Sequence, residues 1–481
     1  MNSLFGADGI RGVIATPPLT DESLHQVGRS VAAWLNESER TPVLLIGTDT
    51  RLSSQRLAGI LIESLNQAGV TTVNSGILPT AALSYLVAKK GFFSGGIVVT
   101  ASHNPINENG IKIFDQHGIK ISDDAENRIE DYFQQRENLP LLVARAHNRI
   151  EEGYLQQYVD ALTREFSQFY WKDFRILIDC ANGAASSTAP SAMEKLGLGF
   201  TLLNAWPDGT NINHLAGSEY IRLGPERMLV NLERYNHSIG IALDGDADRV
   251  VLVDKEGRFY DGDTLLALLA IRFQKANRLG PDKIITTNAS NSGLAEYLNR
   301  FGIQVITVRN GDKYITEALL RQNITLGGEQ IGHLIIHTNS NWVTGDGLRT
   351  ALVVLSELAA NPGMRLADLA PGMRKYPQIK VSVCLDQRTS KSKEEIPGLT
   401  DKIAEIQERF PDVTVRDCRP ASTEATYRLM LESRLTSVLT LANLAYELAI
   451  LICNHLDSDG SNVYMFDCAN GGKISLNQAY R

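Results

Sequence analysis

Cysteine is scarce in this 481-residue chain, whose five cysteines are scattered and include no CxxC pair. Disulfide frameworks and structural zinc sites need paired cysteines, so the sequence favours reduced thiols. Long apolar runs are also missing. The most apolar helical stretch, LANLAYELAILIC, is interrupted by Glu447 and is shorter than a bilayer span requires. The first residues, MNSLFGADGIRG, lack a charged region followed by an apolar one, so no secretory signal is expected.

Basic residues are fewer than acidic ones: the chain has 47 Lys and Arg residues and 55 Asp and Glu residues, a formal net charge of -8. This balance argues against nucleic acid and against an anionic membrane as partners. The hydrophobic content of 43% and the charged content of 21% are those of an ordinary globular protein. We therefore expect a cytoplasmic protein without a nucleic-acid or membrane partner.

Short β-branched apolar runs alternate with amphipathic segments of helical length, as at VLLIG (43–47), RILID (175–179) and KIITT (283–287). This rhythm predicts βα units on mixed or parallel sheets, the α/β class. A chain of this length is too long for one core. The predicted parts are α/β domains at 1–150, 151–255 and 256–371, and a C-terminal α+β domain at 372–481.

The sharpest chemical signal is IGIALDGDADRVVLVD, where Asp244, Asp246 and Asp248 alternate with small residues between apolar runs. In an extended loop three carboxylates at this spacing can converge on one ion, and such hard oxygen donors indicate Mg2+ or another hard divalent cation. A calcium EF-hand does not fit, because Arg249 stands where that loop needs glycine and Lys255 where it needs glutamate. The alternative is a solvated acidic turn, in which like charges would repel one another.

A second signal is VVTASHNPINENGIKIF (98–114), which places Ser102, His103 and Lys112 after an apolar run. Ser102 is a candidate nucleophile. No GxSxG motif surrounds it and no Ser-His-Asp order can be traced, so a hydrolase is not expected. The alternative is an ordinary turn serine beside a hydrogen-bonding histidine.

Two further loops carry groups suited to sugars and phosphates. In TLGGEQIGHLII, Glu329 and His333 lie between apolar runs, where they suit sugar hydroxyls and proton transfer, or simply form a turn between strands. In RDCRPASTEATYRLML two guanidinium groups and two hydroxyls form a donor set that binds phosphate, unless the loop is only solvated. These groups belong to Arg419, Ser422, Thr423 and Arg428.

Together these elements resemble the phosphohexomutases of the α-D-phosphohexomutase superfamily. TASHNP with NGIKIF, DGDADR, GGEQIGH and the late arginine loop stand in the order of that family. LFGADGIRG, GTDTR, DCANGAA, GDKY and TGDG most resemble its bacterial phosphoglucosamine mutase branch. The motifs begin at residue 4 and continue to about residue 450, so the resemblance covers nearly the whole chain.

The resemblance implies four domains around a central cleft and an isomerase that interconverts hexose 6-phosphate and hexose 1-phosphate. It further implies a phosphoserine, a hexose 1,6-bisphosphate as intermediate and primer, and a small sugar phosphate, foremost glucosamine phosphate, as the molecular partner. The implied catalytic residues are Ser102 as phosphoryl carrier, His103 to orient it, and Arg11, Lys112 and His333 beside the reacting hydroxyl, with Lys112 and His333 transferring protons. The implied Mg2+ ligands are Asp244, Asp246 and Asp248, with Ser102 as a further ligand. The implied substrate contacts are Arg249, Glu329, Arg419, Ser422, Thr423 and Arg428.

Some positions depart from the motifs of this family. Ile331 stands where the sugar loop usually has serine, Ser422 where the phosphate loop usually has glycine, and Ala7 where that branch usually has threonine. Losing a hydroxyl that faces a buried sugar group costs about 1 to 3 kcal/mol of binding. The alternatives are therefore a mutase for another hexose phosphate, or a divergent sugar-phosphate-binding or regulatory protein with weak turnover.

The segment from residue 456 onward, LDSDGSNVYMFDCANGGKISLNQAYR, follows the last helix expected for the family. Within it DCANG at 467–471 repeats DCANG at 179–183. We expect an extra strand and turn here, or a partner contact, in a monomer or homodimer.

Overall fold

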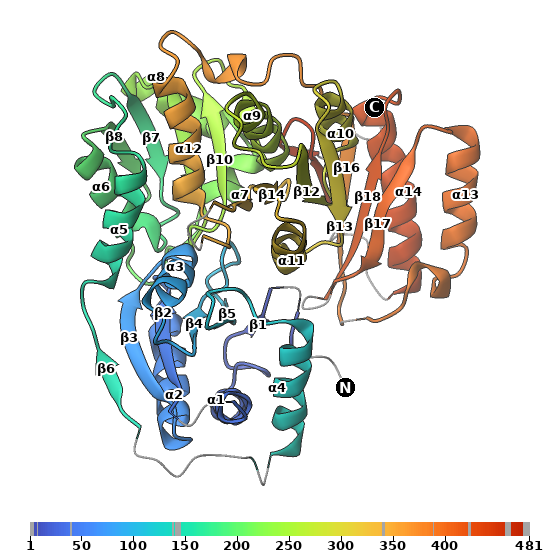
Figure 1. The fold of residues 1–481 in the computed structure, drawn as a ribbon. Coiled ribbons are helices and arrows are strands. Elements are labelled where there is room, and N and C mark those ends of the chain that lie inside the picture. The colour runs from blue at the N-terminus through green and yellow to red at the C-terminus, as the bar shows by residue number, and fades with distance from the viewer. Residues whose placement is uncertain are drawn as a thin grey trace.

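The computed structural model describes residues 4–6, 8–38, 41–136, 139, 146–338, 342–387, 389–421, 425–456 and 463–474. Their strands form four separate sheets. In Figure 1 the chain passes from the blue sheet at the bottom through the green and yellow sheets to the red sheet at the right. The predicted class of three mixed α/β parts and a C-terminal α+β part is confirmed. The exact ends of the four domains stay a prediction, since strand pairing does not define them.

The first sheet is mixed and has helices on both faces. In spatial order its strands are β1 (Ile10–Val13), β5 (Glu108–Asp115), β4 (Gly95–Val99), β2 (Val43–Thr48), β3 (Thr71–Ile77) and β6 (Asn148–Ile150). Its helices are α1 (Asp21–Asn36), α2 (Leu52–Gln67), α3 (Thr80–Lys90) and α4 (Asp123–Gln135). β4 is buried along its whole length, as expected for an apolar strand covered on both faces. The polar chemistry therefore falls in the loop that follows it.

The second sheet carries the aspartate loop between two of its central strands. In spatial order its strands are β11 (Phe259–Tyr260), β10 (Val250–Asp254), β9 (Ile239–Leu243), β7 (Arg175–Asp179) and β8 (Gly199–Leu203). Its helices are α5 (Tyr154–Glu165), α6 (Ala185–Leu196), α7 (Gly217–Arg222) and α8 (Glu226–Tyr235). β9 and β10 are antiparallel, fully buried and joined by residues 244–249. This loop therefore begins and ends on rigid strands.

The third sheet is small, and one of its helices also packs against the second sheet. In spatial order its strands are β13 (Gln304–Val308), β12 (Lys283–Thr287), β14 (Leu326–Gly328) and β15 (Leu334–Ile336). Its helical segments are α9 (Gly262–Lys275), α10 (Ser292–Asn299), α11 (Asp312–Gln322), α12 (Gly347–Ala359) and the 3-10 turn η1 (Leu366–Asp368). α12 contacts β9 and β10 as well as β15, and stands beside β10 in Figure 1. One apolar core therefore continues from the second sheet into the third.

The fourth sheet is antiparallel throughout and has a core of its own. In spatial order its strands are β17 (Thr414–Pro420), β18 (Thr426–Glu432), β16 (Gln378–Cys384), β19 (Val463–Asp467) and β20 (Lys473–Ile474). Its helical segments are the 3-10 turn η2 (Lys393–Glu395), α13 (Leu399–Arg409) and α14 (Val438–His455). β19 and β20 lie in the C-terminal segment, which confirms the extra strand predicted there.

Within the described part of the chain, α14 is the one helix long and apolar enough to cross a membrane. The expectation that this stretch is too short was wrong, because the helix has 18 residues. One face of the helix, including Leu441, Leu448 and Ile452, is fully buried in the core of the fourth sheet, while Leu439 on another face is 43% exposed. α14 therefore packs as a core helix, the kind that also passes a test of length and composition.

Candidate functional site

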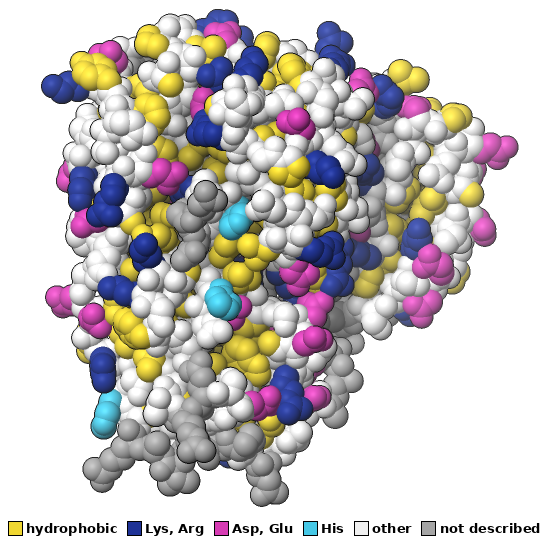
Figure 2. Space-filling view, viewed as in Figure 1, with side chains coloured by type: hydrophobic (Ala, Val, Ile, Leu, Met, Phe, Trp, Pro, Cys, Tyr) yellow, Lys and Arg dark blue, Asp and Glu magenta, His cyan; other side chains and the backbone are white. Residues whose placement is uncertain are grey.

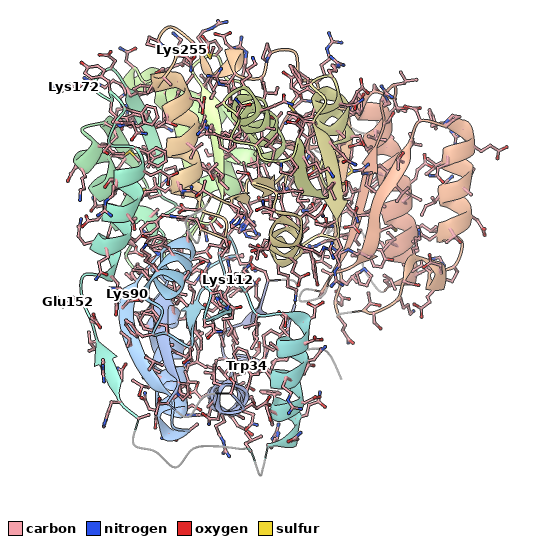
Figure 3. All side chains as sticks on the ribbon, in the orientation of Figure 1. Trp34, Lys90, Lys112, Glu152, Lys172 and Lys255 are labelled. Carbon is pink, nitrogen blue, oxygen red and sulfur yellow. The ribbon has the colours of Figure 1, made fainter. Side chains whose placement is uncertain are left out.

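Loops and strands of all four parts of the chain meet around one cavity of about 200 Å³. The predicted site residues that line it are Arg11, His103, Asp248, Arg249, Glu329, His333, Arg419 and Arg428. Ser102, Lys112, Asp244 and Asp246 are buried next to this wall, through the contacts described below. Figure 3 shows Lys112 in the interior, where the first sheet meets the rest of the molecule. The structure therefore brings together residues that the sequence spreads over more than 400 positions.

The aspartate loop forms a tight cluster of buried carboxylates. One oxygen each of Asp244, Asp246 and Asp248 lies within 4.8 Å of the others. Ala247 has a φ of 60°, a left-handed conformation that helps the loop turn so that its side chains converge. All three aspartates are at most 2% exposed, so the loop is not the solvated acidic turn considered as an alternative.

The cluster fits a hard divalent cation. Asp246 Oδ1 and Asp248 Oδ1 are buried and have no hydrogen-bond partner among the described residues. Burial and the carboxylates of Asp248 and Asp246 raise the pKa of Asp244 well above its usual value. Buried carboxylates at this density stay ionised only beside cations, and Lys112 pairs with just two of the three. Oxygen ligands alone indicate a metal such as Mg2+ or Ca2+ rather than one that prefers nitrogen or sulfur.

Ser102 lies directly against this cluster. Its Oγ donates a hydrogen bond of 2.5 Å to Asp244 Oδ2. The φ of Ser102 is 52°, a strained left-handed conformation that is rare for serine and is frequent at functional sites. Gly245 permits the approach, because a Cβ there would lie 2.4 Å from the Ser102 carbonyl oxygen. The hydroxyl is thus in the position of a further ligand to an ion held by the three aspartates.

A buried ion pair holds the serine loop in place. Arg51 Nε donates to Asp49 Oδ2 at 3.0 Å, and both side chains are fully buried. Arg51 NH2 also donates to the carbonyl oxygens of Ser102 and Asn104, at 3.3 and 2.7 Å. The GTDTR motif therefore supports the reactive loop from behind, a role that its sequence alone did not indicate.

The Arg51→Met substitution should lower the free energy of unfolding by about 3 to 5 kcal/mol, because it leaves the Asp49 carboxylate buried without its cation. Denaturant unfolding monitored by circular dichroism measures the change. Arg56→Met, in the helix α2 that Arg51 precedes, is the matched control, since Arg56 forms an exposed pair with Asp21 that is worth about 1 kcal/mol or less. Equal losses in the two variants would contradict the structural role of Arg51.

The two predicted proton-transfer residues flank the aspartate loop. Lys112 Nζ donates to Asp246 Oδ2 and Asp248 Oδ2, each at 2.7 Å. Burial alone would lower the pKa of Lys112, but the carboxylates of Asp246 and Asp248 outweigh it and raise that pKa well above its usual value. On the cavity side His333 Nδ1 lies 3.6 Å from Asp248 Oδ1. Both side chains therefore lie within reach of a group bound at the aspartates.

A chain of alternating charges crosses the cavity from the first sheet to the third. Arg11 pairs with Asp8, and Asp8 also pairs with Lys120. The ammonium group of Lys120 reaches Asp312 Oδ2 at 2.6 Å. Asp312 begins α11 and lies 3.3 Å from His333 Nε2. These contacts fix the predicted Arg11 and His333 at opposite ends of one network.

His103 is held as a neutral hydrogen-bonding residue. Arg249 NH1 lies 2.8 Å from His103 Nδ1, and since a guanidinium group can only donate, that nitrogen accepts. Burial and the charge of Arg249 lower the pKa of His103 well below its usual value. The same Nδ1 lies 3.3 Å from Ser102 Oγ. Because the Ser102 hydroxyl donates its one proton to Asp244, His103 borders the serine without hydrogen-bonding to it, and Arg249 supplies positive charge beside it.

The sugar loop follows β14 and forms another wall. Glu329 faces the cavity, with Oε1 accepting a 3.4 Å hydrogen bond from the Gly311 N–H, and burial raises the pKa of its carboxyl. Ile331 lines the same wall, so the position where the resembled family has serine presents an apolar group to the cavity. If the sugar binds in this cavity, the change from serine to Ile331 would affect its recognition at this wall.

Part of the predicted phosphate loop is described. Arg419 and Arg428 lie directly opposite each other on β17 and β18, and both line the cavity. Asp417 Oδ1 accepts a 3.0 Å hydrogen bond from Arg419 Nε. The predicted Ser422 and Thr423 lie outside the described residues. The two arginines alone form a cationic wall suited to a phosphate group.

The sequence analysis missed several charged residues of the site. Asp312 belongs to GDKY, which was used only as a family motif. Lys380 had a usable signal, because in KVSVCL it stands among the polar positions that alternate with apolar ones. The missed residues are Asp8, Lys120, Glu219, Arg222, Asp312 and Lys380.

Beside the cavity, charged side chains of both signs gather where α4 and α11 approach each other, as Figure 2 shows. Lys313 of α11 pairs with Asp123 and Glu126 of α4, at 2.5 and 2.6 Å. Arg309 also reaches Asp123, at 2.7 Å. These ion pairs connect the first and third parts of the chain next to the site.

Comparison with known proteins agrees with this geometry. The chain matches three family models in order: "Phosphoglucomutase/phosphomannomutase, alpha/beta/alpha domain I" over residues 2–140, domain II over 156–257 and domain III over 261–376. A phosphoglucosamine mutase of Caldicellulosiruptor bescii is 37% identical over 435 residues, or 90% of this chain and 95% of that relative. One of Clostridioides difficile is 34% identical over 437 residues, with the same shares covered.

Solved structures show the same fold. A phosphoglucomutase/phosphomannomutase family protein from Burkholderia thailandensis has a TM-score of 0.74 and 22% identity, covering 94% of this chain and 97% of its own. The Aspergillus fumigatus N-acetylphosphoglucosamine mutase in complex with GlcNAc-6P and magnesium has a TM-score of 0.62 and 17% identity, covering 95% and 96%. At these identities the likeness concerns the fold alone.

Proposed function

The chain belongs to the phosphoglucomutase/phosphomannomutase family, and from that premise we propose that it interconverts glucosamine 6-phosphate and glucosamine 1-phosphate through a phosphorylated Ser102. Relatives that are 34–37% identical over nine-tenths of the chain are phosphoglucosamine mutases. The observation that carries the proposal is the 2.5 Å contact between Ser102 Oγ and Asp244, beside a cavity with cationic walls. The protein is thus an isomerase that moves a phosphoryl group within a hexose phosphate.

In the proposed cycle a sugar hydroxyl attacks the phosphorus carried by Ser102. The bond between phosphorus and Ser102 Oγ breaks, a new bond to the sugar oxygen forms, and the hydroxyl proton passes to His333, while Lys112 stays protonated beside the reacting group. The resulting 1,6-bisphosphate then turns within the cavity and returns its other phosphoryl group to Ser102. Such transfers depend mainly on positioning and on positive charge around the phosphoryl oxygens, which is what this cavity offers.

The remaining residues have roles that we propose from their contacts or, for Ser422 and Thr423, from the family resemblance alone. Lys112 and Arg249 supply positive charge near the reacting group, and Arg11 does so from β1. His103 lies 3.3 Å from Ser102 Oγ, and its role is to orient the phosphorylated serine through its Nε2–H. The sugar hydroxyls meet Glu329, while the phosphate that is not reacting meets Arg419, Ser422, Thr423 and Arg428.

We propose Mg2+ as the ion held by Asp244, Asp246 and Asp248, with Ser102 Oγ as a further ligand. The buried oxygens Asp246 Oδ1 and Asp248 Oδ1, which accept no hydrogen bond from the described residues, support this assignment. When bound, the ion supplies charge that stabilises the phosphoryl oxygens during transfer. A hexose 1,6-bisphosphate is the proposed primer, because it can phosphorylate Ser102 before the first turnover.

A substrate panel tests the proposed reaction. Glucosamine 6-phosphate, glucose 6-phosphate and mannose 6-phosphate are each supplied with a 1,6-bisphosphate primer and Mg2+, and kcat/KM is compared. The highest value is expected for glucosamine 6-phosphate. A tenfold preference for another sugar would make the chain a mutase of that sugar, and binding without turnover would make it a sugar-phosphate-binding protein.

The Ile331→Ser substitution should raise kcat/KM for glucosamine 6-phosphate by roughly fivefold to a hundredfold, because it restores a hydroxyl worth about 1 to 3 kcal/mol to the sugar wall. Steady-state kinetics measure the change. Ile331→Val is the control, since it also shortens the side chain but adds no hydrogen-bonding group. A gain of equal size with valine would show that space rather than the hydroxyl matters.

The proposed setting is that of a metabolic enzyme in the cytoplasm, whose partner is a small sugar phosphate. The excess of acidic residues over basic ones supports a partner that binds within a local cationic pocket rather than over a broad basic surface. The assembly as a monomer or homodimer stays a prediction.

A further inference from the structure

The face of the fourth sheet that lines the cavity carries a row of cations. Arg419 and Ser382 both lie directly opposite Arg428, on the two strands that flank β18. Residues opposite each other share a face of the sheet, and so do residues two apart on one strand. Lys380, two residues before Ser382, therefore belongs to the same face. The other face carries the apolar side chains that pack against α13 and α14.

The nearest charged neighbours of Lys380 include the cations Arg222 and Arg428. Lys380 lines the cavity, and its Nζ has no hydrogen-bond or ion-pair partner within the described part of the chain. Burial and the charges of Arg222 and Arg428 lower the pKa of its ammonium group. Glu219, a neighbouring carboxylate, is already engaged by Arg222 through bonds of 2.8 and 2.5 Å. The unpaired ammonium group of Lys380 therefore indicates that an anion from outside the protein binds beside it.

The C-terminal strand completes this wall. Phe466 of β19 lies directly opposite Lys380 of β16. The guanidinium group of Arg222 lies 5.7 Å from the centre of the Phe466 ring, a cation–π distance. After β19 the Gly472 N–H donates to the Arg222 carbonyl oxygen at 3.1 Å. The segment beyond the expected end of the family fold thus contacts Arg222, which lines the same cavity as Lys380.

We propose that Lys380 is a further phosphate-binding residue, which contacts the phosphate of the sugar substrate that is not being transferred. The inference rests on the proposed function, since it deepens the phosphate site assigned to Arg419 and Arg428. Arg222, fixed by Glu219 and Phe466, acts as a positioning residue that keeps the Lys380 ammonium directed at the cavity.

Charge separation within the cavity favours phosphate over other parts of the substrate. Lys380, Arg419 and Arg428 line the part of the cavity that the fourth sheet forms, while Asp248 and Glu329 line the parts that the second and third sheets form. A protonated sugar amine would be repelled from the three cations, and a phosphate dianion would be attracted to them. The row of cations therefore also orients an amino-sugar phosphate within the site.

Equilibrium binding tests this role apart from turnover. Calorimetric titration of wild type, Lys380→Met and Lys380→Arg with glucosamine 6-phosphate, inorganic phosphate and unphosphorylated glucosamine isolates the phosphate contact. Lys380→Met should bind the two phosphate ligands roughly tenfold to a hundredfold more weakly, since it loses one charge-assisted hydrogen bond. Lys380→Arg should stay within about threefold of wild type, binding of unphosphorylated glucosamine should not change, and KM should rise by the same factor as the Kd.

Matched variants decide the outcome. Lys402→Met removes the same charge from α13, which packs on the opposite face of the sheet, and should leave binding unchanged. Wild-type binding by Lys380→Met, or equal weakening by Lys402→Met, overturns the proposal. Weaker binding of inorganic phosphate without a rise in KM overturns it too, since the anion site would then be separate from the substrate. If the methionine variant does not fold, Lys380→Gln replaces it in the same titrations. If the wild type has no mutase activity, the proposed function is refuted, but the binding comparison still tests whether Lys380 binds phosphate.

Discussion

Replacing Ser102 with alanine should reduce mutase activity by roughly 10⁴-fold or more, because no other described hydroxyl lies within hydrogen-bond distance of the Asp244 carboxylate. The loss should appear in kcat, since in the proposed cycle Ser102 carries the phosphoryl group while other residues bind the sugar and its second phosphate. A coupled assay of glucosamine 6-phosphate turnover measures the activity, and calorimetry measures the binding that should persist.

Ser356→Ala is the matched control. Ser356 is also buried, but its hydroxyl bonds only to the Val353 carbonyl oxygen within α12. That variant should retain wild-type turnover. If Ser102→Ala kept more than about one-tenth of the wild-type activity, another group would have to carry the phosphoryl group.

Replacing Asp244 with asparagine should abolish the stabilisation that Mg2+ gives to the folded protein. A ligand that binds only the folded state stabilises it by about 2.7 kcal/mol at a hundred times its dissociation constant, so Mg2+ should raise the Tm of wild type but not of the variant. Without metal the variant should melt above wild type, because one of three buried like charges is gone. Turnover should fall by roughly 10³-fold.

Asp254→Asn is the control variant, because it removes a buried carboxylate that lies outside the proposed metal site. Asp254 ends β10, is 4% exposed and accepts hydrogen bonds from backbone N–H groups and from Tyr260, away from the aspartate cluster. Its variant should melt lower than wild type but keep the full Mg2+ response. Equal Mg2+ responses in wild type and Asp244→Asn would refute the metal site.

The features that sequence predicts well here are local ones. The strand around Val43–Thr48 and the aspartate triplet depend on hydrophobic runs and spacing within a few residues. The order of the motifs sufficed to associate Ser102 with Asp244, 142 positions apart, through the family resemblance. Helix α14 was underestimated, because its apolar stretch continues on both sides of the most hydrophobic part.

The features that sequence did not predict depend on pairing between distant segments. Lys120 and Asp312 meet across 192 positions, and nothing in either local pattern indicates the other. Lys380 joins the cavity wall because β16 pairs with β18 on one side and with β19 on the other. Periodicity gives the face of a strand but not the neighbour that the face meets.

The most direct test of the central claim is the mass of the peptide that contains Ser102, measured after incubation with hexose 1,6-bisphosphate and Mg2+. We expect the mass of one phosphoryl group to be added at Ser102, and to be lost when hexose monophosphate is supplied. A protein that turns over its substrate while Ser102 stays unmodified, or that carries the phosphoryl group on another residue, would contradict the account.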